Sequence, residues 1–169
     1  MDVSKIENPS EAEKAIKNLI EKEDLGDDVV IAPKSTDDTI YIQVDDRTYL
    51  ICKNSDVAYD LAVEEEKNYF YIENDLRYCG INLKKFGRTW KEFIKTDDVD
   101  LDDIDNDPSY AGIDWEDATS VAEYFDNEFI DWDKVAEFCV DEDGAAHTLA
   151  RYDEKEIDLE NDYLAYRQE

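Results

Sequence analysis

The stretch from Asp97 to Asp107 limits the possible folds of this chain more than any other feature. Seven of its eleven residues are aspartate, and no lysine or arginine occurs between Thr96 and Lys134. Carboxylates this close together repel one another, so the stretch belongs on a solvated surface and not in a core. It is therefore either a plain acidic surface or a surface that meets a positively charged partner. Our working hypothesis is the second.

The excess of acidic residues restricts the possible partners. The net charge is −29; residues 1–96 hold 21 acids and 14 bases, whereas residues 97–169 hold 26 acids and 4 bases. An acidic surface does not bind DNA or RNA through phosphates, because such binding needs cations that displace condensed counterions. The sequence predicts no direct nucleic-acid contact and favours a basic partner protein that itself binds nucleic acid.

The pattern of hydrophobic residues and turn residues predicts an α+β fold. The expected elements are a helix between Ser10 and Gly26, strands over 29–32, 39–44 and 47–53, a helix from Asn54 to about Tyr78, two helices capped by Asp114 and Asp131, a helical turn over 145–150, and a closing hairpin of strands 156–159 and 163–167. Ser10 followed by Glu13 has capping-box spacing, and Gly26 is expected to end the first helix.

These elements form two halves. Residues 1–96 are expected to be an α/β half, with the N-terminal helix and a small antiparallel β-meander. Residues 97–169 are expected to be an acidic, mostly helical half that ends in a β-hairpin. The second half contains two similar segments, 113–118 and 130–135, that both begin Ile-Asp-Trp. No linker rich in glycine, proline or serine separates the halves, so we expect one compact body.

A basic segment, residues 81–95, directly precedes the aspartates. Its five cations alternate with Phe86, Trp90 and Phe93. Basic residues mixed with aromatics can mark nucleic-acid binding. Their position next to the aspartates favours a different interpretation, in which the cations compensate the adjacent acids within the chain or in a dimer.

The sequence predicts no metal site, no cofactor and no catalytic site. A calcium-binding EF-hand loop beginning at Asp98 would place Asp103 at position 6, where glycine is required, and Ser109 at position 12, where glutamate is required. The single histidine, His147, is expected to be a satisfied, partly buried side chain. We therefore expect that the protein is not an enzyme.

The cysteines and the hydropathy indicate the compartment. Cys52, Cys79 and Cys139 are widely spaced, which is typical of reduced thiols, and Cys52 is expected to be a buried strand residue. The N-terminus lacks the apolar region of a signal peptide, and no window resembles a membrane span. We expect the cytoplasm of a host cell and no membrane contact.

In length, reduced cysteines and richness in Asp, Glu and Tyr, the chain resembles the acidic DNA-mimic proteins of phages and plasmids. These include the ArdA antirestriction proteins and some anti-CRISPR proteins. The C-terminal segment GAAHTLARYDEKEIDLENDYLAYR also looks like the end of small uncharacterised phage proteins, in which a helix, a YDG-type turn and a hairpin follow one another. Glu154 stands where that pattern has glycine. The resemblance implies a phage or mobile-element origin.

These observations together predict a DNA-mimic inhibitor of a host restriction or CRISPR effector that competes with DNA for the effector's basic groove. Tyr110 is a candidate aromatic anchor. The expected partner-binding residues are Asp97, Asp98, Asp100, Asp102, Asp103, Asp105, Asp107, Asp114, Glu116, Asp117, Asp131 and Asp133.

Two other functions remain open at this point. One is an acidic adaptor or immunity-type protein that binds a basic partner, which differs from a mimic because DNA need not displace it. The other is an enzyme, which would need a pocket of convergent polar groups with a perturbed His147 or Cys139. The oligomeric state, including a homodimer, is also open.

Overall fold

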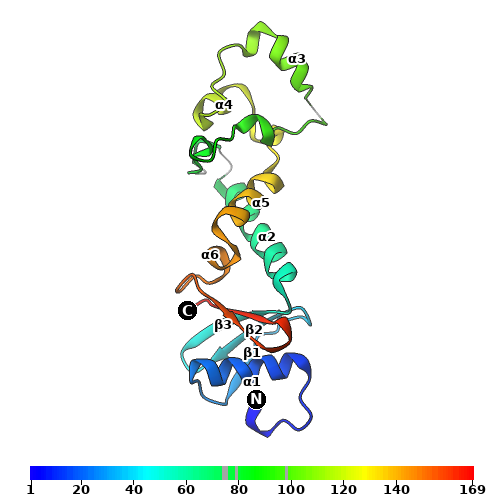
Figure 1. Ribbon diagram of the computed structural model, residues 1–169, viewed down its shortest axis with the longest axis vertical. Helices are drawn as coiled ribbons and strands as arrows, with labels where there is room; N and C mark the ends of the chain where they lie inside the picture. Colours follow the sequence, from blue (N-terminus) through cyan, green and yellow to red (C-terminus); the bar gives the residue numbers. More distant parts are fainter. Residues whose placement is uncertain (74–75, 79, 98) are drawn as a thin grey trace. The chain divides into compact units, whose positions relative to one another are not determined.

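The computed structural model describes residues 1–73, 76–78, 80–97 and 99–169 and has an α+β fold (Figure 1). Its helices and strands are α1 (Glu11–Glu23), β1 (Val29–Ile31), β2 (Thr39–Val44), β3 (Arg47–Cys52), α2 (Ser55–Glu73), α3 (Leu101–Asn106), α4 (Ala118–Tyr124), α5 (Trp132–Asp143), α6 (Ala145–Leu149), β4 (Glu156–Asp158) and β5 (Leu164–Arg167). The chain divides into two compact units, one of residues 1–63 with 139–169 and one of residues 64–138. The expected boundary at residues 96 and 97 falls inside the second unit.

The first unit is built on an antiparallel sheet with the strand order β1-β2-β3-β5-β4. Its three N-terminal strands are the expected meander, and β4 and β5 are the expected closing hairpin. The hairpin joins the meander, because β5 lies between β3 and β4, with Ala165 opposite both Ile51 and Ile157. The last residues of the chain are thus a central strand of the sheet that the first fifty residues begin.

Helix α1 covers one face of this sheet (Figure 1). The Ser10 hydroxyl accepts from the Glu13 amide and the Glu13 carboxylate accepts from the Ser10 amide, so the predicted capping box is confirmed. The prediction that Gly26 ends the helix is wrong. Asp24 takes the left-handed conformation at the C-cap, with φ of 50°. An aspartate tolerates this conformation because its short polar side chain can bond locally.

The opposite face of the sheet is covered only in part. Leu50, Cys52 and Tyr166 on this face are completely buried, which confirms the interpretation of Cys52 as a core residue. Helix α6 contacts β5 here. Toward the other edge, Val30 on β1 is 61% exposed. The side chains that cover this face therefore end between β3 and β1, which leaves this part of the sheet open to solvent.

The second unit has a core of aromatic and branched aliphatic side chains. Trp90 and Phe93, in a short 3-10 helix η4 (Trp90–Phe93), are buried, and Ile94 forms a β-bridge with Ile130. The aromatics of the basic segment are thus mainly core residues, since only Phe86 among them is exposed. Within the described residues, no helix is both long and apolar enough to cross a membrane.

Two expected helix boundaries in this unit are wrong. Helix α4 is capped by Asp117 and not by Asp114, so Trp115 lies before the helix instead of in its first turn. The helix expected to reach about Tyr78 does not do so as an α-helix, because α2 is described as far as Glu73 and Leu76–Tyr78 forms a 3-10 turn. The start of α5 is as expected, because the Asp131 carboxylate accepts from the Lys134 amide.

The turn before β4 contains a strained residue whose replacement should stabilise the protein. Glu154 has φ of 56°, in the left-handed region that glycine adopts without steric cost. Its ion pair with His147, at 3.3 Å, is solvent-exposed and contributes little. We expect Glu154→Gly to raise the free energy of unfolding by about 0.5–1 kcal/mol, measured by urea denaturation. Glu154→Ala is the matched control and should give no gain, because alanine keeps the Cβ; an equal gain would contradict the explanation.

Buried tyrosines should make the first unit sensitive to alkaline pH. Burial raises the pKa of Tyr49, Tyr163 and Tyr166, and the Tyr166 hydroxyl also donates to the Glu156 carboxylate at 2.8 Å. As pH rises above about 10, the unfolded chain loses these protons first, so stability present below that pH is progressively lost. Urea midpoints measured from neutral pH to about pH 11 should fall, and the fall should be smaller in Tyr166→Phe. A midpoint independent of pH across this range would contradict the assignment.

Candidate functional site

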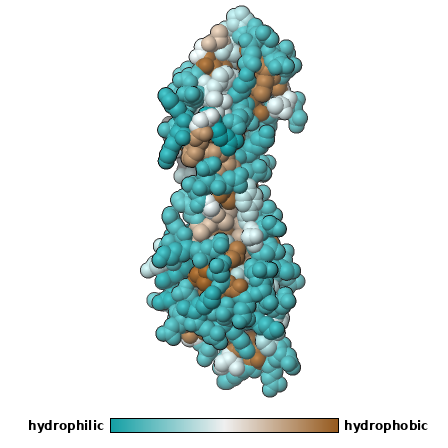
Figure 2. Space-filling view, viewed as in Figure 1, coloured by the Kyte–Doolittle hydropathy of each residue, from teal (hydrophilic) through white to brown (hydrophobic). Residues whose placement is uncertain are grey.

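The expected partner-binding residues lie on the second unit, and nearly all are exposed. Of those that the structure describes, only Asp131 is half-buried; Asp98 lies outside the described residues. The aspartate stretch itself contains helix α3, which Asp100 caps by accepting from the Asp102 amide at 2.9 Å. Figure 2 shows hydrophilic side chains over most of the visible face of the molecule, with small hydrophobic patches among them.

Several of these aspartates shape the backbone as well as carrying charge. Their carboxylates accept from main-chain amides two or three residues ahead, which caps a helix or closes a turn. The residues that do so are Asp100, Asp107, Asp114, Asp117 and Asp131. Local folding thus accounts for part of the aspartate density. A hydrogen bond to an amide leaves the charge in place, so these side chains still contribute to the negative field.

Three other candidates are paired with lysines of the same unit. Lys91 contacts both carboxylate oxygens of Asp105 at 2.6 Å, Lys84 lies 3.8 Å from Glu116, and Lys67 lies 2.8 Å from Asp133. The prediction that the basic segment compensates neighbouring acids is confirmed for Lys84 and Lys91. The acidic surface available to a partner is correspondingly smaller than the sequence indicates.

Three of the expected partner-binding residues have carboxylates without a partner in the described part of the chain. The side chains of Asp97, Asp102 and Asp103 are exposed, and their carboxylates form no hydrogen bond or ion pair with any residue that the structure describes. Asp102 and Asp103 lie in the first turn of α3, where the helix dipole favours negative charge by a few tenths of a kcal/mol. That benefit is much smaller than the repulsion that such a cluster accumulates, so folding alone does not explain these three side chains.

A pocket of about 380 Å³ opens beside α3. Carboxylates and aromatic rings line it together: Val99, Asp100, Asp103, Ile104, Asp107, Tyr110, Tyr124, Phe125 and Phe129. Tyr110 stacks on Phe125 with ring centroids 5.6 Å apart and an interplanar angle of 13°. The Tyr124 hydroxyl approaches Gly112 so closely that a Cβ there would lie 2.8 Å from it, which fits a glycine at that position.

The chemistry of this pocket suits a cationic side chain. Carboxylates attract a guanidinium or ammonium group, and aromatic faces hold such a cation by its interaction with the ring quadrupole. Sequence reasoning identified Tyr110 and the three aspartates but not Tyr124 or Phe129. The sequence does not predict that Tyr124 and Phe129 line the pocket, because tertiary structure brings these rings together where the loop after α3 returns to α4.

The other residues with reactive side chains do not assemble around this pocket. His147 belongs to the first unit, and its side chain is 49% exposed, so the expectation that it is partly buried is wrong. Cys139 is half-buried, and Cys79 lies outside the described residues. Within the part of the chain that the structure describes, no group of three or more potential ligands could hold a metal ion.

Comparison of the chain with protein-family models, with curated proteins and with solved structures gives no significant match.

Proposed function

We propose that the protein is a DNA-mimic inhibitor whose acidic surface on the second unit occupies the DNA-binding groove of a host restriction or CRISPR effector. The observation that carries the proposal is the group of exposed, internally unpaired carboxylates Asp97, Asp102 and Asp103, of which Asp103 lines an aromatic pocket. The inhibitor would act in the host cytoplasm by steric and electrostatic competition, without covalent chemistry and without a cofactor.

The spacing of the charges supports this proposal. From Asp100 to Asp107 the chain advances roughly 10 Å at the helical rise. Once the lysine-paired Asp105 is discounted, four carboxylates remain over this length, or about one per 3 Å. One DNA strand carries a phosphate about every 3.4 Å. This edge of the unit thus has the charge density of one strand, although not that of a duplex.

The pocket adds an anchor that a line of charges lacks. An arginine or lysine of the partner would place its alkyl stem against Tyr110 and Phe125 and its charged group at Asp100 and Asp103. Salt weakens the attraction between exposed charges, whereas a cation held in the pocket is partly protected. We therefore expect binding that weakens with salt and retains a component that is insensitive to it.

The same pocket favours a second candidate function, an immunity-type or adaptor protein for a basic partner. A pocket for a single cationic side chain is a usual feature of protein–protein interfaces, where arginine and aromatic residues are enriched. The two candidates differ in what the partner's surface normally binds. Only a mimic occupies the site that DNA uses.

Capture of the partner from host lysate tests the proposal. The protein, immobilised through its N-terminus, is incubated with lysate at low and raised salt, with and without an excess of duplex DNA. We expect a DNA-binding protein to be captured and then released by DNA. Capture of a basic protein that DNA does not release would contradict the mimic and support the immunity-type function.

A further inference from the structure

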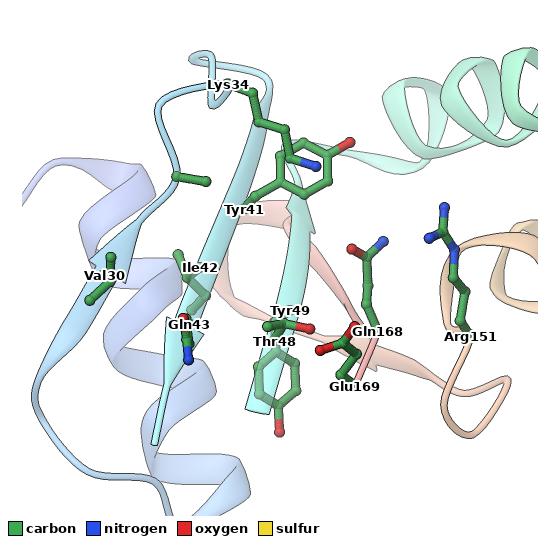
Figure 3. A pocket seen from close by; sticks show the side chains of 11 residues that line it. Val30, Lys34, Tyr41, Ile42, Gln43, Thr48, Tyr49, Arg151, Gln168 and Glu169 are labelled. Carbon is green, nitrogen blue, oxygen red and sulfur yellow. The ribbon is translucent and has the colours of Figure 1, made fainter. Parts of the chain in front are cut away.

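The first unit contains a second pocket, of about 300 Å³, on the face of the sheet opposite α1 (Figure 3). The strand register places Val30, Gln43 and Thr48 side by side across β1, β2 and β3. Gln168 extends this row, because its main-chain amide donates to the Thr48 carbonyl at 2.9 Å. The pocket lies where the cover of this face ends, and its floor is a row in which the polar side chains of Gln43, Thr48 and Gln168 follow the apolar Val30.

The charge of this pocket is unlike that of the rest of the molecule. In a chain of net charge −29, it is lined by the cations Lys34 and Arg151 and by one acidic residue, Glu169. The Lys34 ammonium lies over the Tyr41 ring, 3.8 Å from its centroid, and forms no ion pair with any described carboxylate. Figure 3 shows Lys34 and Arg151 at separate sides of the pocket, with Gln168 and Glu169 between them.

Lys34 and the polar floor supply hydrogen-bond donors for an anion. The lysine ammonium carries three donors, and a cation held by a ring keeps them available to an acceptor. The Thr48 hydroxyl and the Gln43 side-chain amide can donate as well, and the Gln168 side-chain amide, which donates to the Leu149 carbonyl at 3.5 Å, has a second N–H. Arg151 adds positive charge to the same pocket. A carboxylate or phosphate is the acceptor that such a set fits best.

The apolar walls and the volume of the pocket restrict the size and polarity of the part of the ligand that does not carry the charge. Val30, Ala32 and the Tyr41 ring provide apolar surface, and the 61% exposure of Val30 leaves part of that surface uncovered. About 300 Å³ is at the low end for ligand pockets, which fits a body of a single ring. An acidic peptide is less suitable, because the surrounding surface is itself negative and would repel its other charges.

We propose that this pocket binds a small organic anion, a carboxylate or phosphate carried on a flat apolar ring, with the anionic group at Lys34 and the ring against Val30, Ala32 and Tyr41. This proposal does not depend on the proposed function, since the pocket belongs to the other unit of the chain.

Titration of the full chain with benzoate, phenyl phosphate and neutral benzamide, followed by amide NMR, tests this proposal. We expect both anions to shift the amides of residues 30–32, 34, 41–43, 48 and 168, and benzamide to bind about tenfold more weakly because it cannot form the charge-assisted bond. A preference for benzoate would indicate a carboxylate ligand, and a preference for phenyl phosphate a phosphate. Equal binding of benzamide, or no shift at these amides, would overturn the proposal.

A pair of lysine variants locates the anionic group. Lys34→Gln should weaken both anions about tenfold without changing benzamide. Lys14→Gln removes an equally exposed charge from α1, which covers the other face of the sheet, and should have no effect. If both variants weaken the anions to the same extent, the attraction is a general effect of charge and the assignment to Lys34 is wrong.

Discussion

Replacing Asp102 and Asp103 together by lysine is expected to weaken binding to the partner by about a hundredfold, mainly by slowing association. These two carboxylates have no internal partner among the described residues and lie on α3, beside the aromatic pocket. Their reversal introduces two cations where the partner's groove is itself basic, so attraction becomes repulsion. The measurement is the association rate at two salt concentrations, by surface plasmon resonance.

A matched variant separates the effect of the acidic surface from that of net charge. Asp141 and Glu142 are also adjacent, exposed acids, in the last turn of α5, and their replacement by lysine changes the net charge by the same amount. This control should alter association by less than threefold or so, because the changed charges lie outside the proposed surface. Equal losses in both variants would show that only total charge matters and would contradict the assignment of binding to a specific acidic surface. Asp102→Asn with Asp103→Asn, which adds no cation, should give an intermediate loss.

Replacing Tyr166 by alanine is expected to lower the free energy of unfolding by about 3–5 kcal/mol. Tyr166 is completely buried in β5, next to Leu50 of β3, and its hydroxyl donates to Glu156. Removing the ring leaves a cavity in the middle of the sheet. Urea denaturation monitored by hydrogen exchange of the β2 and β3 amides measures the loss where it arises.

The conservative variant Tyr166→Phe keeps the ring and should cost only about 1 kcal/mol, the net contribution of one hydrogen bond. Tryptophan fluorescence provides an independent reference, because Trp90, Trp115 and Trp132 all belong to the second unit. Equal and small losses for the alanine and phenylalanine variants would contradict the central position of β5 in the sheet.

Features set by neighbouring residues could be predicted from the sequence. The capping box of Ser10 and Glu13 needs only a spacing of three residues. The β2–β3 hairpin follows from alternating side chains around the turn at Asp45 and Asp46. In both cases the interacting groups are close along the chain, so their pattern determines the local structure.

Features that depend on distant pairing could not be predicted. Nothing near Ala165 indicates that it pairs with Ile51, more than one hundred residues earlier in the chain. The repeated Ile-Asp-Trp pattern suggested equivalent caps, but Asp117 satisfies the α4 amides while the Asp114 amide donates to Ser120. The same limit applies to the candidate site, since the sequence shows the aspartates but not which of them a lysine neutralises.

The proposed function requires that the acidic surface of the second unit occupies a site that otherwise binds DNA. Competition between this protein and a labelled duplex for the captured partner tests it most directly. We predict mutually exclusive binding: the apparent Kd for the duplex rises in proportion to inhibitor concentration, and the Asp102→Lys, Asp103→Lys variant loses this effect. A ternary complex of inhibitor, partner and duplex, with the duplex affinity unchanged, would contradict the claim.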